Sequence, residues 1–243
     1  MATDKNTIFG LYGCDADEHF LDEFYKSPLY SAIEKDPNCL ILEICAGADI
    51  ERLNGRRLHL ATEDEYRKLS VKTLKFIQYC CLNFSPPQII KFDVTCMRRS
   101  FDGPAFAGRK PLNLDELERF IDLQLASPLR AGNSKRLEAH YTGFVFRGSP
   151  RFANIENWGR KKGGVTFPRH VFASESDIPN YYQGKCYAIS EDLAAFIASE
   201  GHSIAHQHKK LLHGSEDLMI ARLANKFCGI NSLGNGEKAK AIR

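Results

Sequence analysis

Short apolar runs alternate with amphipathic stretches along the first half of the chain. The runs TIFGLYGC (7–14), CLILEIC (39–45), RRLHLAT (56–62) and QIIKFDVTC (88–96) are typical of buried strands. Between them, HFLDEFYKSPLYSAI (19–33) predicts a helix interrupted near Pro28, and EYRKLSVKTLKFIQYCC (65–81) places its apolar residues on one helical face. Strands separated by helices predict an α/β fold, with a mostly parallel central sheet that helices cover on both faces.

The second half is less regular but still predicts discrete elements. NLDELERFIDLQLA (113–126) reads as a helix with Asn113 as its N-cap, and HYTGFVFRG (140–148) as a strand. Ser190 is expected to cap the helix EDLAAFIASEG, with Gly201 ending it in a loop, and EDLMIARLANKF (216–227) predicts a last helix. We expect one domain over residues 1–231 and a flexible tail over 232–243.

Composition narrows the class of protein. The 243 residues are 43% hydrophobic and 26% charged, which suits a globular domain, and a net charge of +3 gives little support for nucleic-acid binding. No apolar run is long enough to span a membrane, and no secretory signal is visible at the start. We therefore expect a cytoplasmic protein, or one whose targeting segment is missing from this sequence. The eight cysteines lack metal-ligand spacing, and several lie in apolar runs, so they are interpreted as mostly buried, reduced thiols.

Two stretches stand out as candidate binding segments. Asp93 ends an otherwise apolar strand, and the carboxyl ends of strands are where open α/β sheets bind ligands. IPNYYQGKCYAISEDL (178–193) combines three tyrosines with Gly184, which would let a ligand approach the backbone closely. The plainer alternatives are a turn or capping aspartate and an aromatic core strand with a glycine bulge.

Several segments match a family pattern in the same order along residues 57–231. The matching residues are Tyr66 with Lys72-Thr73-Leu74, Lys91 with Asp93, Pro179 with Tyr181 or Tyr182, Gly184, Tyr187, Ser190 and Asp192-Leu193, then Glu216-Asp217, and Gly229-Ile230. In this order they resemble the β-1,3-galactosyltransferases and N-acetylglucosaminyltransferases, which are fringe-like inverting enzymes of the GT-A fold. The resemblance implies a GT-A-like α/β domain that transfers galactose or N-acetylglucosamine from a UDP-sugar to a glycan hydroxyl, in a β-1,3 linkage. As an alternative to a cytoplasmic protein, it implies the soluble catalytic part of a membrane-anchored Golgi-type protein.

The resemblance also suggests roles for individual residues. Asp217 is expected to be the catalytic base, with Glu216 as its neighbour and orienting group. The residues we assign to the donor are Lys91, Asp93, Thr95, Arg98, Gly184, Lys185 and Tyr187. Those we assign to the acceptor are Trp158, Tyr181 and Tyr182. The alternatives are an ordinary helix start at Ser215-Glu216-Asp217 and a loop tryptophan packed on the core.

The chain also departs from the family pattern. The family binds a divalent cation, such as Mn²⁺, through three consecutive aspartates, but here the segment reads Asp93-Val94-Thr95, which leaves Asp93 as the only candidate ligand in it. The family's histidine after the late acid pair is also missing. We hypothesise that Arg98-Arg99 or Arg160-Lys161-Lys162 partly replaces the metal on the diphosphate, although a solvated basic surface is the commoner role of such clusters.

These departures keep a second class of function open. A catalytically inactive relative, acting as a glycan- or protein-binding module or folding partner, would tolerate the loss of two aspartates, whereas the intact Glu216-Asp217 pair favours an enzyme. The segment around His202 and His206 has the spacing of a helical metal site, but it is interpreted mainly as a polar surface segment.

Overall fold

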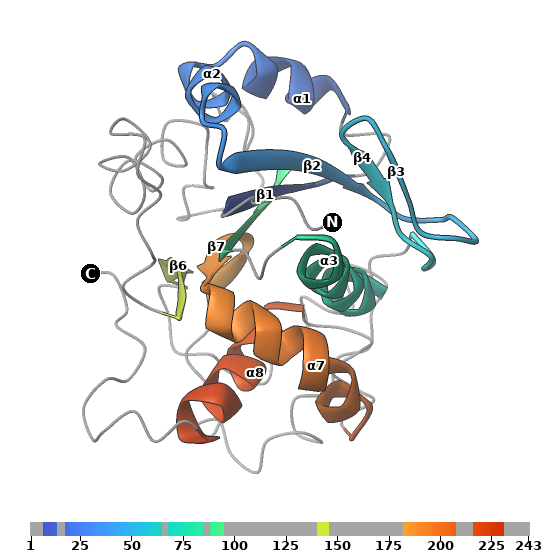
Figure 1. Ribbon diagram of the computed structural model, residues 1–243, viewed down its shortest axis with the longest axis vertical. Helices are drawn as coiled ribbons and strands as arrows, with labels where there is room; N and C mark the ends of the chain where they lie inside the picture. Colours follow the sequence, from blue (N-terminus) through green and yellow to red (C-terminus); the bar gives the residue numbers. More distant parts are fainter. Residues whose placement is uncertain are drawn as a thin grey trace, which may run out of the picture.

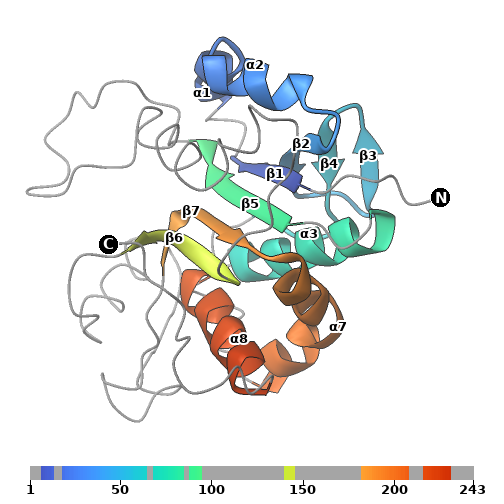
Figure 2. The same cartoon turned by 60° about the vertical axis from the view of Figure 1, so that its left-hand side comes forward.

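The computed structural model describes residues 7–13, 18–64, 68–84, 88–94, 140–145, 182–207 and 216–230. Within these residues the chain forms an α/β structure in which a mixed sheet of seven strands lies between two helical layers (Figures 1 and 2). The strand order is β3-β4-β2-β1-β5-β7-β6. The strands are β1 (Thr7–Tyr12), β2 (Cys39–Cys45), β3 (Arg52–Asn54), β4 (Arg57–His59), β5 (Gln88–Asp93), β6 (Tyr141–Val145) and β7 (Tyr182–Ile189).

The sheet is mixed, and its parallel part is the centre. Strands β4, β2, β1 and β5 pair in parallel, whereas β3, β7 and β6 each pair antiparallel with their neighbours. Helices connect β1 to β2 and β4 to β5, whereas β3 connects β2 to β4; each connection returns the chain to the same edge, and this explains the parallel direction of these strands. The expected predominance of parallel pairing is not confirmed, because the pairs β3–β4, β5–β7 and β6–β7 are antiparallel.

Helices cover both faces of the sheet, as the sequence predicts. Helices α1 (Glu18–Tyr25) and α2 (Pro28–Lys35) lie on one face of the sheet. They pack on the side of β1 that carries Phe9 and Leu11, which belong to the same apolar cluster as these helices. Helices α3 (Leu69–Asn83), α7 (Glu191–Gln207) and α8 (Glu216–Ile230) lie on the other face, where Ile8 and Tyr12 belong to a larger cluster. The alternation along β1 thus divides the core into two halves.

Local signals in the sequence set several of these boundaries. Ser27 caps α2 by accepting a hydrogen bond from the backbone N–H of Tyr30, and Pro28 occupies the first helical turn. Ser190 caps α7 in the same way through the N–H of Leu193, at 3.3 Å, as predicted. Gly55 and Arg56 form a tight turn between β3 and β4, and Gly55 has φ 59°, a conformation that suits glycine.

Some predicted boundaries are wrong. The predicted strand 56–62 is the shorter β4 (Arg57–His59), and β3 was not predicted. Helix α7 does not end at Gly201 but continues to Gln207. A Cβ at position 201 would lie 3.1 Å from the side chains of Leu74 and Ile197, so this glycine allows α7 to pack closely against α3. The predicted helix 113–126 and the tail 232–243 lie outside the described residues.

The described cysteines are free thiols, in agreement with the prediction of reduced cysteines. Three of them are buried (Cys39, Cys80, Cys186) and three are partly buried (Cys45, Cys81, Cys228). Among the helices that the structure describes, none combines the length and the apolar character needed to cross a membrane.

Candidate functional site

The four parallel strands end at a common edge of the sheet. Their last residues are Tyr12, Cys45, His59 and Asp93, for β1, β2, β4 and β5 respectively. The chain proceeds from β1 to β2 and β4 on one side, and then crosses to β5 on the other side of β1. The gap between the ends of β1 and β5 is therefore the topological switch point, where open α/β sheets bind their ligands.

A buried ion pair lies just below this edge. The Nζ of Lys91, in β5, is 3.3 Å from Oε2 of Glu216, the first residue of α8, and the two side chains are 2% and 1% exposed. Removing two charges from water is costly, and only close pairing and further hydrogen bonds make it tolerable. Both groups have further partners, so the pair joins the sheet firmly to the start of α8.

Two hydroxyl groups complete the surroundings of Glu216. Tyr187 of β7 and Thr73 of α3 both donate hydrogen bonds to its Oε1, the latter at 3.3 Å. Burial, followed by the nearby charge of Glu216, raises the pKa of Tyr187 well above its ordinary value, so the tyrosine remains a neutral donor. The carboxylate of Glu216 thus ties together α3, β5, β7 and α8.

The register of the sheet explains why Lys91 and Tyr187 meet. They are paired directly across β5 and β7, on the face that α8 covers. Gly10 of β1 lies opposite Lys91 on the other side, and a Cβ at position 10 would approach the ring of Phe76 to 2.6 Å. Glycine at this position therefore leaves room for an aromatic ring beside the lysine.

Tyr12 separates the buried ion pair from a second lysine. The Nζ of Lys91 is 4.8 Å from the centre of the Tyr12 ring, and that of Lys72, from α3, is 5.8 Å from it. Both distances are within the range of cation–π attraction. Burial raises the pKa of Tyr12 well above its ordinary value, so its ring is neutral beside the two ammonium groups.

Lys72 reaches the carboxyl edge of the sheet from α3. Its Nζ is 3.1 Å from Oδ1 of Asp64 and 3.5 Å from the carbonyl oxygen of Gly13, the residue after β1. The lysine side chain is 6% exposed, whereas that of Asp64 is 41% exposed. At the end of β2, burial raises the pKa of the Cys45 thiol, and the charge of Lys72 partly offsets this effect. The switch point thus holds a buried cation with an exposed anionic partner.

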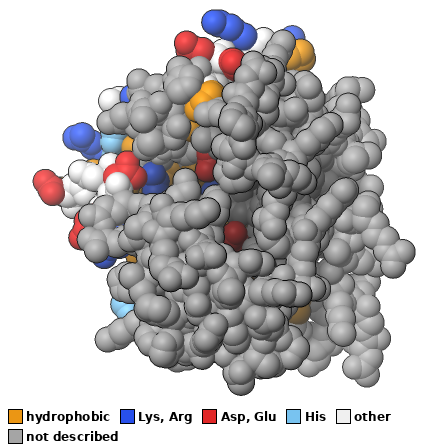
Figure 3. All heavy atoms as spheres, turned by 180° about the vertical axis from the view of Figure 1, so that it is seen from behind, with side chains coloured by type: hydrophobic (Ala, Val, Ile, Leu, Met, Phe, Trp, Pro, Cys, Tyr) orange, Lys and Arg blue, Asp and Glu red, His pale blue; other side chains and the backbone are white. Residues whose placement is uncertain are grey.

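The two acids of the last helix occupy different environments. Glu216 is buried in the ion pair, whereas Asp217 is only partly buried in the first turn of α8. Asp93 is also partly buried, at the end of β5 and in register with Tyr12. In the view from behind, acidic side chains are visible within a recess near the centre of the face (Figure 3).

The remaining predicted site residues divide into two groups. One group belongs to β7 and comprises Tyr182, Gly184 and Lys185. This strand begins four residues before Cys186, which pairs with Phe92, so its start extends past the part of β5 that it pairs with. The residues that lie outside the described part of the chain are Thr95, Arg98, Arg99, Trp158, Arg160, Lys161, Lys162 and Tyr181.

The described residues at the strand end do not fit a divalent cation. Val94 stands where the family pattern has a second aspartate, and its side chain is 2% exposed and belongs to the apolar cluster under α1 and α2. It packs so closely on the chain that a Cβ at Gly13 would lie 2.6 Å from it. Within the described ranges no three His, Cys, Asp or Glu side chains gather as metal ligands. A hard cation prefers several oxygen ligands, and Asp93 supplies only one side chain.

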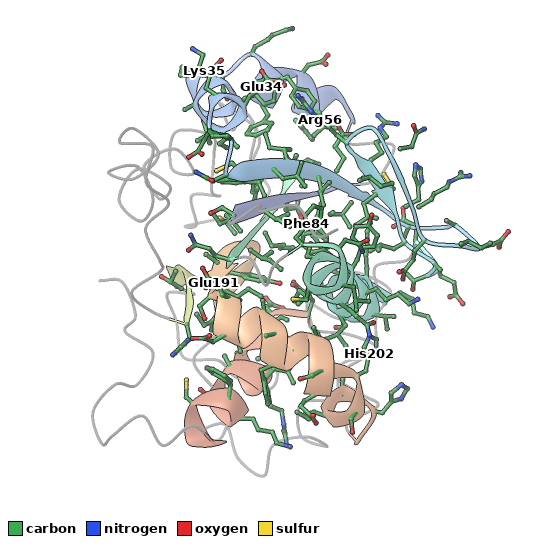
Figure 4. The ribbon with its side chains drawn as sticks, in the orientation of Figure 1. Glu34, Lys35, Arg56, Phe84, Glu191 and His202 are labelled. Atoms are coloured by element: carbon green, nitrogen blue, oxygen red, sulfur yellow. The ribbon has the colours of Figure 1, made fainter. Side chains whose placement is uncertain are left out.

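Other candidate clusters lie away from this edge. His202 and His206 lie one turn apart on α7, which corrects the predicted loop, and His202 lies at the far end of that helix from Glu191 (Figure 4). On the other helical layer, Arg56 contacts Glu34 at 2.5 Å beside α2 (Figure 4). The charges of Arg56 and Glu34 are exposed, pair with each other and belong to the surface.

Sequence reasoning did not single out Tyr12 or Lys72 as part of a site. Tyr12 looked like one more apolar residue of a strand, and Lys72 was noted only as part of a helix motif. The available signal was a lysine on the otherwise apolar face of a helix, where a charge needs a partner.

The geometry therefore joins residues from four segments of the chain around one buried carboxylate, close to the switch point of the sheet. No model of a known protein family matches this chain, and no curated protein matches it at a significant level.

Proposed function

We propose that this chain is an inverting glycosyltransferase of the β-1,3 type, which transfers galactose or N-acetylglucosamine from a UDP-sugar to a glycan hydroxyl. The observation that carries the proposal is the convergence on Glu216. Lys91, Tyr187 and Thr73 belong to three separate motifs of the family pattern, and all three bond directly to its carboxylate. The contacts of Thr73 and Lys91 with Glu216 span 143 and 125 residues of sequence, so local structure does not account for them.

In this proposal the two acids of α8 have different tasks. Asp217 is the general base, because it is the more exposed of the two acids, whereas Glu216 is held in the buried ion pair with Lys91. Glu216 is the anchor that positions the first turn of α8 through Lys91. A base at this place need only be within hydrogen-bond reach of the acceptor hydroxyl.

The proposed reaction is a single displacement. Asp217 takes the proton of the acceptor hydroxyl while the oxygen forms a bond to the anomeric carbon. The bond from that carbon to the diphosphate oxygen breaks on the opposite side, and its electron pair leaves with UDP. The configuration at the anomeric carbon is therefore inverted. Asp93, at the switch point, is proposed to contact the donor, with the start of β7 at Gly184 beside the sugar.

One observation favours a second candidate, a catalytically inactive relative that binds a glycan or a protein. Val94 is buried among apolar side chains, so the strand end has lost a carboxylate at a position where the family pattern uses one. A binding module or folding partner would retain the buried anchor of α8 for stability alone. The two candidates therefore differ in the need for Asp217 and agree on the need for Glu216.

Release of UDP separates the candidates. The purified chain is incubated with UDP-galactose or UDP-N-acetylglucosamine, with and without oligosaccharide acceptors, in Mn²⁺, Mg²⁺ or chelator. We expect Asp217→Asn to reduce release by roughly 100-fold or more, the scale of general-base catalysis. Asp192→Asn is the matched control, because Asp192 is the second residue of α7, as Asp217 is of α8. Absence of release from the wild-type chain would favour the inactive relative, and release that Asp217→Asn and Asp192→Asn reduce equally would refute Asp217 as the base.

A further inference from the structure

The switch point between β1 and β5 carries a positive charge that belongs to the protein. Lys72 places its ammonium group 3.5 Å from the carbonyl oxygen of Gly13, at the end of β1. The neighbouring strand ends at Asp93, which is in register with Tyr12. Ligands of open α/β sheets bind in this crevice, beyond the carboxyl ends of the strands. An anionic ligand placed there would meet Lys72.

The partner of Lys72 can be exchanged. The lysine is buried, but Asp64, which accepts its hydrogen bond at 3.1 Å, is 41% exposed. A phosphate oxygen offers the same kind of acceptor as a carboxylate oxygen, and lysine binds phosphate as a compact point charge. Moving the exposed Asp64 aside would therefore transfer the ammonium group from one anion to another without burying an unpaired charge.

Among the described residues, this edge does not gather the ligands of a divalent cation. Val94 fills its position with buried apolar atoms, packed against Gly13. Lys72 and Val94 both lie next to Gly13, the residue after β1, so the described part of this point has a cation on one side and an apolar side chain on the other.

We propose that the diphosphate of the donor binds at the end of β1 without a divalent metal, and that Lys72 supplies the cation, released from Asp64 as the ligand enters. This inference rests on the proposed function only in naming a nucleoside diphosphate as the ligand. It assigns the role of the cation to Lys72 instead of to the basic clusters that follow β5 in the sequence.

Direct binding of UDP tests the inference, measured by titration calorimetry with and without chelator. We expect chelation to leave the affinity unchanged and Lys72→Met to weaken it by roughly tenfold or more, the scale of a hydrogen bond to a charged group. Lys75→Met is the matched control: Lys75 lies one turn along α3 and pairs at 3.3 Å with Glu51, which precedes β3, a strand separated from β1 by β4 and β2. Uridine, which lacks the phosphates, should not distinguish the two variants.

A second variant keeps the test decisive if Lys72→Met does not fold. Asp64→Asn leaves Lys72 in place and removes the carboxylate that competes with the ligand, so UDP should bind several-fold more tightly. Three results would overturn the inference. Chelator could abolish UDP binding, Lys72→Met and Lys75→Met could weaken it equally, or Asp64→Asn could leave the affinity unchanged.

Sugar release distinguishes this inference from the proposed function. Chelator-insensitive UDP binding that depends on Lys72, in a chain that releases no sugar, would support the inference and refute the transferase. Release of UDP from UDP-sugars that requires Mn²⁺ would support the transferase and overturn the inference.

Discussion

Breaking the buried ion pair should destabilise the protein far more than breaking an exposed one. Lys91 and Glu216 are almost fully buried, and Glu216 accepts further hydrogen bonds from Tyr187 and Thr73. Replacing Lys91 with Met leaves the carboxylate buried without its cation. Loss of one partner of such a pair lowers the free energy of unfolding by about 3–5 kcal/mol.

The chain offers a matched pair for comparison. Lys75 and Glu51 are also 3.3 Å apart, but their side chains are 27% and 34% exposed. Water screens such a pair, so Lys75→Met should cost about 0–1 kcal/mol. The double variant Lys91→Met/Glu216→Leu should recover part of the loss, because it removes both charges and leaves apolar side chains of similar size.

Urea unfolding followed by circular dichroism measures these differences, provided that the slope of the transition is the same in each variant. The reasoning is refuted if Lys91→Met costs no more than Lys75→Met. It is also refuted if the loss of stability in the double variant, relative to wild type, equals the sum of the losses in Lys91→Met and Glu216→Leu, since that would mean that the two charges do not interact.

Three further predictions concern packing and titration. Gly10→Ala should lower the free energy of unfolding by about 1–3 kcal/mol, because the new Cβ would lie 2.6 Å from the ring of Phe76. Phe76→Leu should partly restore the stability. In the same urea assay Gly229→Ala should cost nothing, because its Cβ would meet no atom within 4 Å. Burial is the main cause that lowers the pKa of His202 from 6.5, so the unfolded state binds more protons than the folded state. The free energy of unfolding should therefore fall as the pH drops below 6.5. His202→Asn should reduce this loss between pH 7.5 and pH 5. Burial raises the pKa of Cys81 to about 11, so its alkylation, followed by peptide mass spectrometry, should accelerate by about tenfold per pH unit above pH 8, and a plateau by pH 9 would contradict the assignment.

Strands and caps with strong local signals could be predicted from the sequence. The limits of β2 agree with the predicted run 39–45, because an apolar segment between turn residues has few alternatives. The helix predicted over 19–33 is interrupted near Pro28, as expected, and Ser190 starts a helix at the predicted place, since such residues act on the backbone within a few positions.

Features that depend on distant packing could not be predicted in the same way. Gly201 was expected to end a helix, but its role is to admit the side chain of Leu74 from α3, which no local pattern reveals. The direction of β7 was also beyond local reasoning, since an apolar strand looks the same whichever way it pairs. Only the path of the chain between β5 and β7 decides it.

The candidate site illustrates the same limit at the level of single charges. Glu216 and Asp217 are consecutive acids at a helix start, and by sequence they are equivalent solvated groups in a favourable first turn. Neighbouring residues of a helix point about 100° apart, so one acid can face the sheet while the other faces the strand ends. Lys91 pairs with the first of them, and this pairing, together with the hydrogen bonds from Tyr187 and Thr73, makes its burial tolerable. The difference in environment, rather than the motif, therefore assigns the anchoring role to Glu216, and it is the reason why the proposed mechanism gives proton transfer to Asp217.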